Sequence, residues 1–98
     1  MSYSLEFRDS ALKEWRKLDG SLREQFKVRL AERLENPRIE SARLAGLSDC
    51  YKIKLRAAGY RLVYQVVDTR VVIVVVAVGK REDSTVYRKA QGRLKQDK

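Results

Sequence analysis

Residues 50–78 read CYKIKLRAAGYRLVYQVVDTRVVIVVVAV, and this stretch decides the fold. It contains three runs of strand-forming residues, at about 50–56, 60–67 and 71–78, separated by the short connections AAGY and DTR. Connections this short favour an antiparallel meander, because parallel strands need a long crossover between them. The last run is apolar on both faces, which predicts a central strand that is covered on both sides.

The first of these strands carries a row of cations. In an extended strand Lys52, Lys54 and Arg56 point to one face, roughly 7 Å from one to the next, and the intervening Tyr, Ile and Leu point to the other. If AAGY is a four-residue loop, Arg56 pairs with Arg61 and Lys54 with Val63, so Arg61 joins the cationic face. A slip by one residue would reverse this assignment.

The N-terminal stretch predicts a strand followed by a helix. Residues 2–8, SYSLEFR, alternate between polar and apolar side chains, as in a half-buried strand. With Asp9 or Ser10 as the N-cap, the sequence ALKEWRKL at 11–18 places its apolar residues on one face of a helix. Gly20 is expected to break this helix.

A second helix is expected to begin at Ser21, which has capping-box spacing to Glu24, and to end at Asn36–Pro37. Two helices joined by so short a connection form an antiparallel hairpin. A short edge strand fits residues 43–44, and a C-terminal helix with a frayed tail fits about 84–98. The whole chain is therefore predicted to be a single α+β domain, with an N-terminal strand, a helical hairpin, an antiparallel sheet of three to four strands and a C-terminal helix.

The net charge of +9 is concentrated in the second half of the chain. Residues 1–50 contain ten Lys and Arg against nine Asp and Glu, whereas residues 51–98 contain twelve against four. A concentrated positive field attracts polyanions, of which nucleic acid is the commonest. No apolar run is long enough to span a bilayer, the N-terminus lacks signal-peptide features, and Cys50 has no second cysteine to pair with. These features predict a cytoplasmic protein without membrane contact.

The residue inventory excludes several mechanisms. The chain has no His, one Cys and no Gly-rich phosphate loop, so a His-based acid–base pair, a catalytic triad and a zinc site are not expected. We expect no metal and no other cofactor. Lys, Arg and Tyr remain, and they bind phosphates, stack on bases and stabilise the anionic transition state of phosphodiester cleavage.

The candidate groups for such chemistry each have an alternative interpretation. Repulsion within the cationic row favours the neutral, basic form of Lys52 or Lys54, although a bound phosphate acts in the opposite direction. Arg stays protonated, so Arg61 and Arg81 are expected to act as electrostatic clamps before anything else. Tyr87 can stack on a base or move a proton, or it can simply fill the core. The cationic row itself can be a solvated face, and the basic residues of the two helices, which alternate with acids, are more typical of one.

Several segments resemble the RelE toxins of bacterial toxin–antitoxin systems in order and spacing: ALKEWRKL, REQ, NPRIE, L-x-G, DCYKIKLR, GYRLVYQV and VGKRE. The resemblance covers about residues 3–90, and the block DCYKIKLRAAGYRLVYQV is similar to RelE more specifically than to the wider RelE/ParE superfamily. It implies a compact α+β fold. It also implies an endoribonuclease that inhibits translation by cleaving mRNA in the ribosomal A site, through attack of a 2′-hydroxyl on the scissile phosphate.

The resemblance implies a role for five residues. Arg61 and the two lysines would stabilise the phosphate, Arg81 would lie near the leaving 5′-oxygen, and Tyr87 would act as base or as stacking group, while the lysines compete for the base role. The implied catalytic set is Lys52, Lys54, Arg61, Arg81 and Tyr87, and the implied RNA contacts are Arg56, Lys80, Lys13, Arg16, Lys17, Arg23 and Lys27. The chain departs from the family at Ala45, in a loop where RelE-like chains can carry a further Arg or Lys.

The implied partners are the ribosome with its 16S rRNA and mRNA, a RelB-like antitoxin, and operator DNA that is reached through the antitoxin, with the toxin as co-repressor. Antitoxins of this kind wrap the toxin and can displace its C-terminal helix. Two other functions compete with the nuclease. A ParE-like inhibitor of DNA gyrase shares the fold but generally lacks the Lys/Lys/Arg/Arg/Tyr set, and a non-catalytic RNA-binding module needs the basic face but not Arg81 together with Tyr87.

Overall fold

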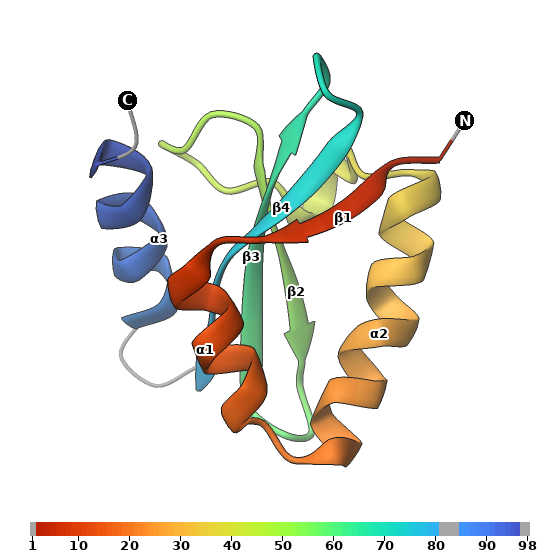
Figure 1. Cartoon of the computed structure of the whole chain (residues 1–98), viewed down its shortest axis with the longest axis vertical. Coiled ribbons are helices and arrows are strands. Elements are labelled where there is room, and N and C mark those ends of the chain that lie inside the picture. Colours follow the sequence, from red (N-terminus) through yellow and green to blue (C-terminus); the bar gives the residue numbers. More distant parts are fainter. Residues whose placement is uncertain (1, 81–84, 97–98) are drawn as a thin grey trace.

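The computed structural model describes residues 2–80 and 85–96 and contains one four-stranded sheet with helices on both faces (Figure 1). The chain runs from a strand through two helices and a three-stranded meander to a last helix. The elements are β1 (Ser4–Phe7), α1 (Asp9–Lys17), α2 (Gly20–Glu35), the short 3-10 helix η1 (Glu40–Ala42), β2 (Cys50–Leu55), β3 (Tyr60–Val67), β4 (Val72–Lys80) and α3 (Thr85–Gln96).

The sheet has the order β1-β4-β3-β2. Strands β2, β3 and β4 form the predicted antiparallel meander, and β1 adds to β4 in the parallel sense. The prediction of a central, doubly covered strand is confirmed, because β4 lies between β1 and β3 and most of its side chains are buried.

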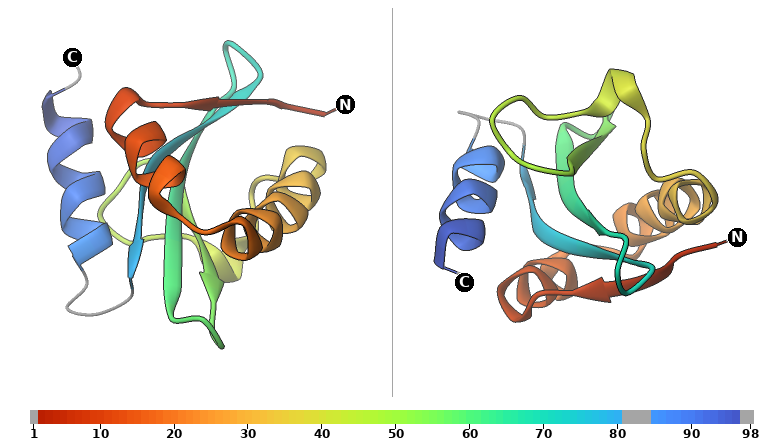
Figure 2. Two further views of the ribbon diagram at one scale, coloured as in Figure 1. Left: turned by 60° about the horizontal axis from the view of Figure 1, so that its bottom comes forward. Right: turned by 90° about the horizontal axis from the view of Figure 1, so that it is seen from above.

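Two apolar clusters lie on opposite faces of the sheet. On one face, helices α1 and α2 pack against the sheet, and they diverge from their connection instead of lying close along each other (Figure 1). On the other face, α3 contributes Val86 and Ala90, which pack against Val63, Val76 and Ala77 (Figure 2). Both terminal parts of the chain therefore enclose β4.

The two helix starts differ from the sequence prediction. Helix α1 begins at Asp9 with Arg8 at the N-cap and no side-chain capping bond, so neither predicted N-cap residue caps it. Asp9 instead lies in the first turn, where a carboxylate is favoured by the positive end of the helix dipole. Helix α2 is capped by Asp19, whose carboxylate accepts from the Leu22 N–H at 2.9 Å.

The capping box at Ser21 was therefore wrong, since Asp19 caps the helix two residues earlier. Gly20 is the first residue of α2 instead of a helix breaker, and the chain turns at Leu18 and Asp19. The predicted end of α2 is confirmed, with Asn36 at the C-cap.

The register of the β2–β3 hairpin is shifted by two residues from the prediction. Lys54 pairs with Arg61, where Val63 was predicted, because Leu55 and Tyr60 already form the closing pair. The loop keeps four residues but moves to 56–59, and Gly59 fits this placement: its φ of 70° suits a loop position, and its N–H donates to the Leu55 carbonyl at 2.8 Å. A two-residue shift preserves the face of every side chain, so Arg61 does join the cationic face as predicted.

Strand β4 contains a bulge that the sequence did not indicate. Tyr64 pairs with Val75 and Val63 with Ala77, which leaves Val76 as the extra residue. Both Val76 and Ala77 consequently belong to the apolar cluster on the α3 face.

The remaining predictions concern the connections and the C-terminus. The expected edge strand is reduced to a single bridge between Arg43 and Tyr51, which follows η1. The C-terminal helix is confirmed as α3, whereas its predicted first residue Ser84 and the end of its tail at 97–98 lie outside the described residues. No helix in the described part of the chain is long and apolar enough to cross a membrane.

Candidate phosphate site on the sheet

The α3 face of the sheet is only partly covered. Helix α3 packs more on β4 than on β3, and Leu44 and Leu47 of the preceding connection pack at the Cys50 end of this face. Lys52, Lys54 and Arg61 stand on the β2–β3 side, each half-buried, and Lys54 is directly opposite Arg61 across the two strands. Like charges directly opposite each other in a sheet repel, so these groups form a cationic surface at a cost in stability.

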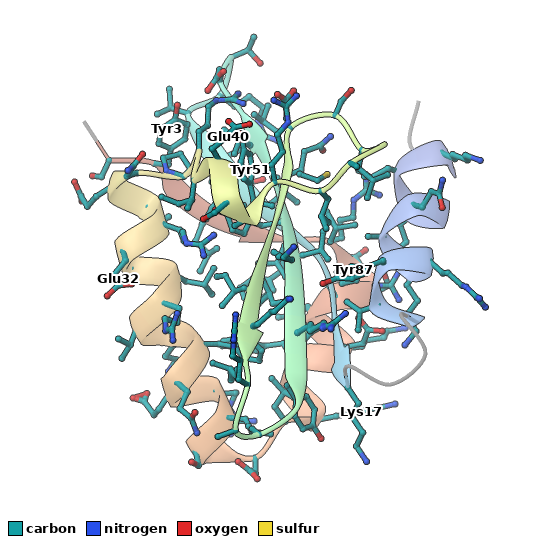
Figure 3. All side chains as sticks on the ribbon, turned by 180° about the vertical axis from the view of Figure 1, so that it is seen from behind. Tyr3, Lys17, Glu32, Glu40, Tyr51 and Tyr87 are labelled. Atoms are coloured by element: carbon teal, nitrogen blue, oxygen red, sulfur yellow. The ribbon has the colours of Figure 1, made fainter. Side chains whose placement is uncertain are left out.

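Helix α3 brings Tyr87 against this cationic surface. The Tyr87 side chain points from α3 toward the sheet (Figure 3), and the Arg61 guanidinium carbon lies 5.0 Å from the centroid of its ring. The Arg61 Nε and the Tyr87 hydroxyl are both buried, and neither has a hydrogen-bond partner among the described residues. Buried polar atoms are rarely left without partners, so these two are available to a ligand.

The environment of Tyr87 favours its neutral phenol. Burial raises the pKa of Tyr87 above its ordinary value, and the positive charge of Arg61 acts in the opposite direction but does not offset burial. The hydroxyl therefore keeps its proton near neutral pH, which suits hydrogen-bond donation better than proton abstraction.

Two adjoining hollows extend the surface to the edge of the sheet. A hollow of about 190 Å³ is lined by Lys54, Leu55, Arg56, Tyr60 and Arg61. A larger one, of about 540 Å³, shares three of these residues and reaches α2 through Arg29 and Arg33. Because the two hollows share Lys54 and Arg56, the cationic surface continues from β3 around β2 to α2.

Arg29 and Arg33 were not among the predicted site residues. Arg33 donates to the Lys52 carbonyl at 3.2 Å and to the Tyr64 hydroxyl at 2.9 Å, so it attaches α2 to the edge of the strand that carries the lysines. The signal was present in the sequence: Arg29 and Arg33 are one helical turn apart and therefore share a face.

The other predicted residues are placed as follows. Arg81 lies outside the described residues. Arg56 is exposed in the β2–β3 loop, and Lys80 is exposed at the end of β4. On the helices, Lys17 points into solvent at the end of α1 (Figure 3), together with the exposed Lys13 and Arg16.

Two helical residues also have partners within the chain. Arg23 donates to the carbonyls of Leu18 and Arg16, which ties its guanidinium to the end of α1. Lys27 forms an exposed ion pair with Glu24 at 3.6 Å. Neither contact prevents an additional interaction with RNA, so both assignments stay predictions.

The arrangement favours phosphate chemistry. No group of three His, Cys, Asp or Glu within the described ranges is positioned to hold a metal ion. Cys50 is not an available nucleophile, since burial, assisted by the nearby Asp49, raises the pKa of its thiol to about 11. What the surface offers is two lysines and an arginine on neighbouring strands, with the Tyr87 ring against the arginine, a set that can bind a phosphodiester and stabilise added negative charge on it.

Comparison with known proteins gives consistent matches. Residues 5–85 match the family described as ParE toxin of type II toxin-antitoxin system, parDE. The mRNA interferase toxin RelE of Escherichia coli K12 and the mRNA interferase RelE of Shigella flexneri are each 60% identical over 94 residues, which span 96% of this chain and 99% of the relative.

Solved structures show the same similarity. A mutant of E. coli toxin RelE in the free state is 58% identical, with a TM-score of 0.89 over 96% of this chain and 99% of the other. The E. coli RelBE toxin–antitoxin complex matches at 60% identity and a TM-score of 0.80, over 83% of this chain and 99% of the other. An archaeal RelE–RelB complex from Pyrococcus horikoshii, 21% identical with a TM-score of 0.63, shares the fold.

Proposed function

The chain belongs to the ParE toxin family of type II toxin–antitoxin systems, and we propose that the cationic surface beneath Tyr87 is where it cleaves mRNA. The chain is an mRNA interferase toxin of the RelE type, an endoribonuclease whose partner is a RelB antitoxin, as follows from 60% identity over nearly its whole length and from the match to the RelBE complex. The same relatives give no support to the gyrase-inhibitor alternative.

One observation carries the proposal for the site. Arg61 and Tyr87 meet at 5.0 Å, and each has a buried polar atom with no hydrogen-bond partner in the described part of the chain, on the face from which Lys52 and Lys54 project. A scissile phosphate in the adjoining hollow supplies the acceptors that Arg61 lacks and offsets the repulsion between Lys54 and Arg61. Both deficits of the unliganded protein are thus relieved by the same anion.

The proposed reaction is an internal displacement at phosphorus. The 2′-oxygen of the RNA forms a bond to the scissile phosphorus while the bond to the 5′-oxygen breaks, giving a cyclic phosphate and a 5′-hydroxyl. One protein base accepts the 2′-hydroxyl proton, and the leaving 5′-oxygen takes up a proton. Arg61 and the lysines stabilise the extra charge on the phosphoryl oxygens, and Arg81 is assigned to the leaving oxygen.

The base is one of the lysines in this scheme. The raised pKa of Tyr87 argues against the phenolate and leaves Tyr87 to stack on a base and to donate a hydrogen bond. Lys52 and Lys54 are then the candidates for the base.

Dependence on the ribosome is a further part of the proposal. The surface is open and has no His, so it is poorly suited to fix a flexible RNA by itself. A ribosome that holds the A-site codon would supply the orientation, which is worth several kcal/mol in such reactions. Arg56 and Lys80 would contact the mRNA, and the helical cations Lys13, Arg16, Lys17, Arg23 and Lys27 would contact 16S rRNA.

The proposal implies a cytoplasmic toxin. It works where ribosomes translate, and it reaches operator DNA through its antitoxin, as a co-repressor.

Primer extension on a defined mRNA, with and without programmed ribosomes, tests the function. A cut within the A-site codon that requires ribosomes supports the proposal. Cleavage of free RNA would contradict ribosome dependence, and no cleavage in either reaction would contradict the nuclease. With the Arg81→Ala variant we expect growth inhibition to be lost and ribosome binding to be largely retained, whereas parallel loss of both would favour a pure binding module.

A further inference from the structure

Beyond Val75, β4 has no β1 partner, and side chains of other elements satisfy two of its backbone groups. Arg93 of α3 donates to the Val76 carbonyl at 2.7 Å, and the Glu14 carboxylate of α1 accepts from the Val78 N–H at 3.0 Å. The Val76 carbonyl belongs to the extra residue of the bulge, and the Val78 N–H lies two residues further along the strand. Helices on opposite faces of the sheet therefore meet at one point of β4.

The two side chains also bind each other. Arg93 donates to both Glu14 carboxylate oxygens, at 2.9 and 3.0 Å, and Lys89 donates to Glu14 at 2.9 Å. The Glu14 and Arg93 side chains are only 17% and 19% exposed, so water screens this pair less than the exposed Glu6–Arg70 pair, at 41% and 59%. Lys89 and Arg93 are one helical turn apart, and Glu14 therefore holds a whole turn of α3.

The remaining attachment of α3 is small. Its fully buried side chains are Val86 and Ala90, among the smallest apolar residues. Arg8, the residue before α1, adds one hydrogen bond to the Arg93 carbonyl at 3.2 Å. Tyr87 and Leu94 pack on the same apolar cluster while partly exposed, and the charged contacts add to this apolar area in fixing the position of the helix.

We propose that Glu14 and Arg93 are positioning residues for the nuclease: they hold α3 on β4 so that Tyr87 lies against Arg61. This inference rests on the function proposed above. Tyr87 is only two residues from Lys89, which Glu14 holds, on the same helix. A rotation or displacement of that turn therefore moves the Tyr87 phenol away from the Arg61 guanidinium. Neither Glu14 nor Arg93 touches the RNA in this scheme.

The test combines Glu14→Gln, which keeps the shape but removes the charge, with the milder Arg93→Lys, which keeps the charge but loses the bidentate geometry. Hydrogen exchange of α3 amides measures attachment, with β4 amides as the reference for global folding. Single-turnover mRNA cleavage on programmed ribosomes measures the rate, and ribosome binding is measured separately. Glu6→Gln, which breaks a short ion pair away from α3, is the matched control.

We expect Glu14→Gln to speed α3 exchange by about tenfold and to slow cleavage by about tenfold, as for loss of one buried charge-assisted contact. Arg93→Lys should change both in the same direction by less, with β4 exchange and ribosome affinity near wild type. In a Tyr87→Ala background, Glu14→Gln should slow cleavage by less than about twofold, because the group that it positions is gone.

The inference would be overturned if Glu14→Gln and Arg93→Lys both kept wild-type α3 exchange and wild-type cleavage. It would also be overturned if Glu14→Gln lowered the rate equally with and without Tyr87. A fall in rate for Glu6→Gln as large as that for Glu14→Gln would do the same. A wild-type chain that does not cleave would overturn the proposed function instead, while the exchange measurement would still decide whether Glu14 and Arg93 hold α3.

Discussion

At the scale of single residues, the groups that form the cationic surface lower the stability of the folded protein. Lys54 faces Arg61 across two strands, and the buried Arg61 Nε–H has no hydrogen-bond partner within residues 2–80 and 85–96. Unsatisfied buried donors and opposed like charges are both unfavourable. Such deficits are tolerated where a ligand supplies the missing partner, and here a phosphate would do so.

Replacing Arg61 should make the folded protein more stable and remove its activity. Arg61→Met keeps an unbranched side chain beneath the Tyr87 ring and removes the charge and the unpartnered donor. We expect the free energy of unfolding to rise by about 1 kcal/mol, measured by urea denaturation, while cleavage on ribosomes is abolished. Arg70→Met, which removes an exposed cation paired with Glu6, is the control and should leave cleavage unchanged. A less stable Arg61→Met that still cleaves would refute this interpretation.

Tyr87 should act through its ring more than through proton abstraction. Since burial raises the pKa of Tyr87, a phenolate base would give a cleavage rate that climbs with pH to beyond the ordinary tyrosine value of 10.0. We expect no such climb. Tyr87→Phe should keep most of the rate, whereas Tyr87→Ala should lose about 10- to 100-fold through lost stacking, as measured in pH–rate profiles. A wild-type profile that still rises at high pH, and becomes flat in Tyr87→Phe, would assign the base to Tyr87.

At the scale of elements, sequence patterns gave the strands, their faces and their order in the meander, but not their register. The alternation of Lys with Tyr, Ile and Leu determines which residues share a face, and that survived a two-residue shift. The shift itself depends on where Gly59 takes its positive φ, which no alternation encodes. The bulge at Val76 could not be predicted from the sequence either, because a run of valines has no polar residue to mark a change of face.

Some residues of the candidate site could be predicted from the sequence and others could not. Lys52, Lys54 and Arg61 could be predicted from periodicity, because they lie within one hairpin. The contribution of Arg33 and the meeting of Glu14 with Arg93 depend on how helices dock on the sheet, across large separations in sequence. Local patterns carry no information on such contacts.

The approach of α3 to the sheet should be sensitive to Gly79. This residue pairs with Arg61 in the sheet, and a Cβ placed on it would lie 3.1 Å from the Val86 Cγ2 of α3. Gly79→Val should therefore push α3 away, slow cleavage and speed exchange of the α3 amides, with β4 still protected. Gly92→Ala in α3 is the control, because a Cβ on Gly92 would lie in open space and the substitution should be neutral or slightly stabilising. Unchanged α3 exchange in Gly79→Val would show that the contact is not limiting.

Acid should loosen α3 through Glu14. Burial alone would raise the pKa of Glu14, but hydrogen bonds from Arg93, the Val78 N–H and Lys89 bring it below 4.5. A lowered pKa means that this stabilisation is complete above pH 4.5 and is lost as the pH falls through the lower folded value. Arg93 and Lys89 are the charged groups that face Glu14. The exchange protection of α3 should fall below about pH 4 in wild type and change less in Glu14→Gln; equal changes in both would assign the effect to other carboxylates.

At the scale of the whole molecule, the fold separates scaffold from charge. Residues 1–50, nearly neutral, supply β1, α1 and α2, whose apolar side chains form the larger core with one face of the sheet. Residues 51–98 supply the excess of positive charge and the cationic surface. In the proposed function, such an open surface would bind RNA without orienting it, and the ribosome would supply the orientation.

The most direct test of this account separates chemistry from binding. Single-turnover cleavage at saturating programmed ribosomes, and affinity for those ribosomes, should be measured for Lys52→Met/Lys54→Met and for the matched helical pair Lys17→Met/Lys27→Met. We predict that the sheet pair lowers the cleavage rate by more than about 100-fold and the affinity by less than about tenfold, while the helical pair leaves the rate unchanged. Loss of affinity in step with rate for the sheet pair, or an unchanged rate, would contradict the claim that this surface performs the reaction.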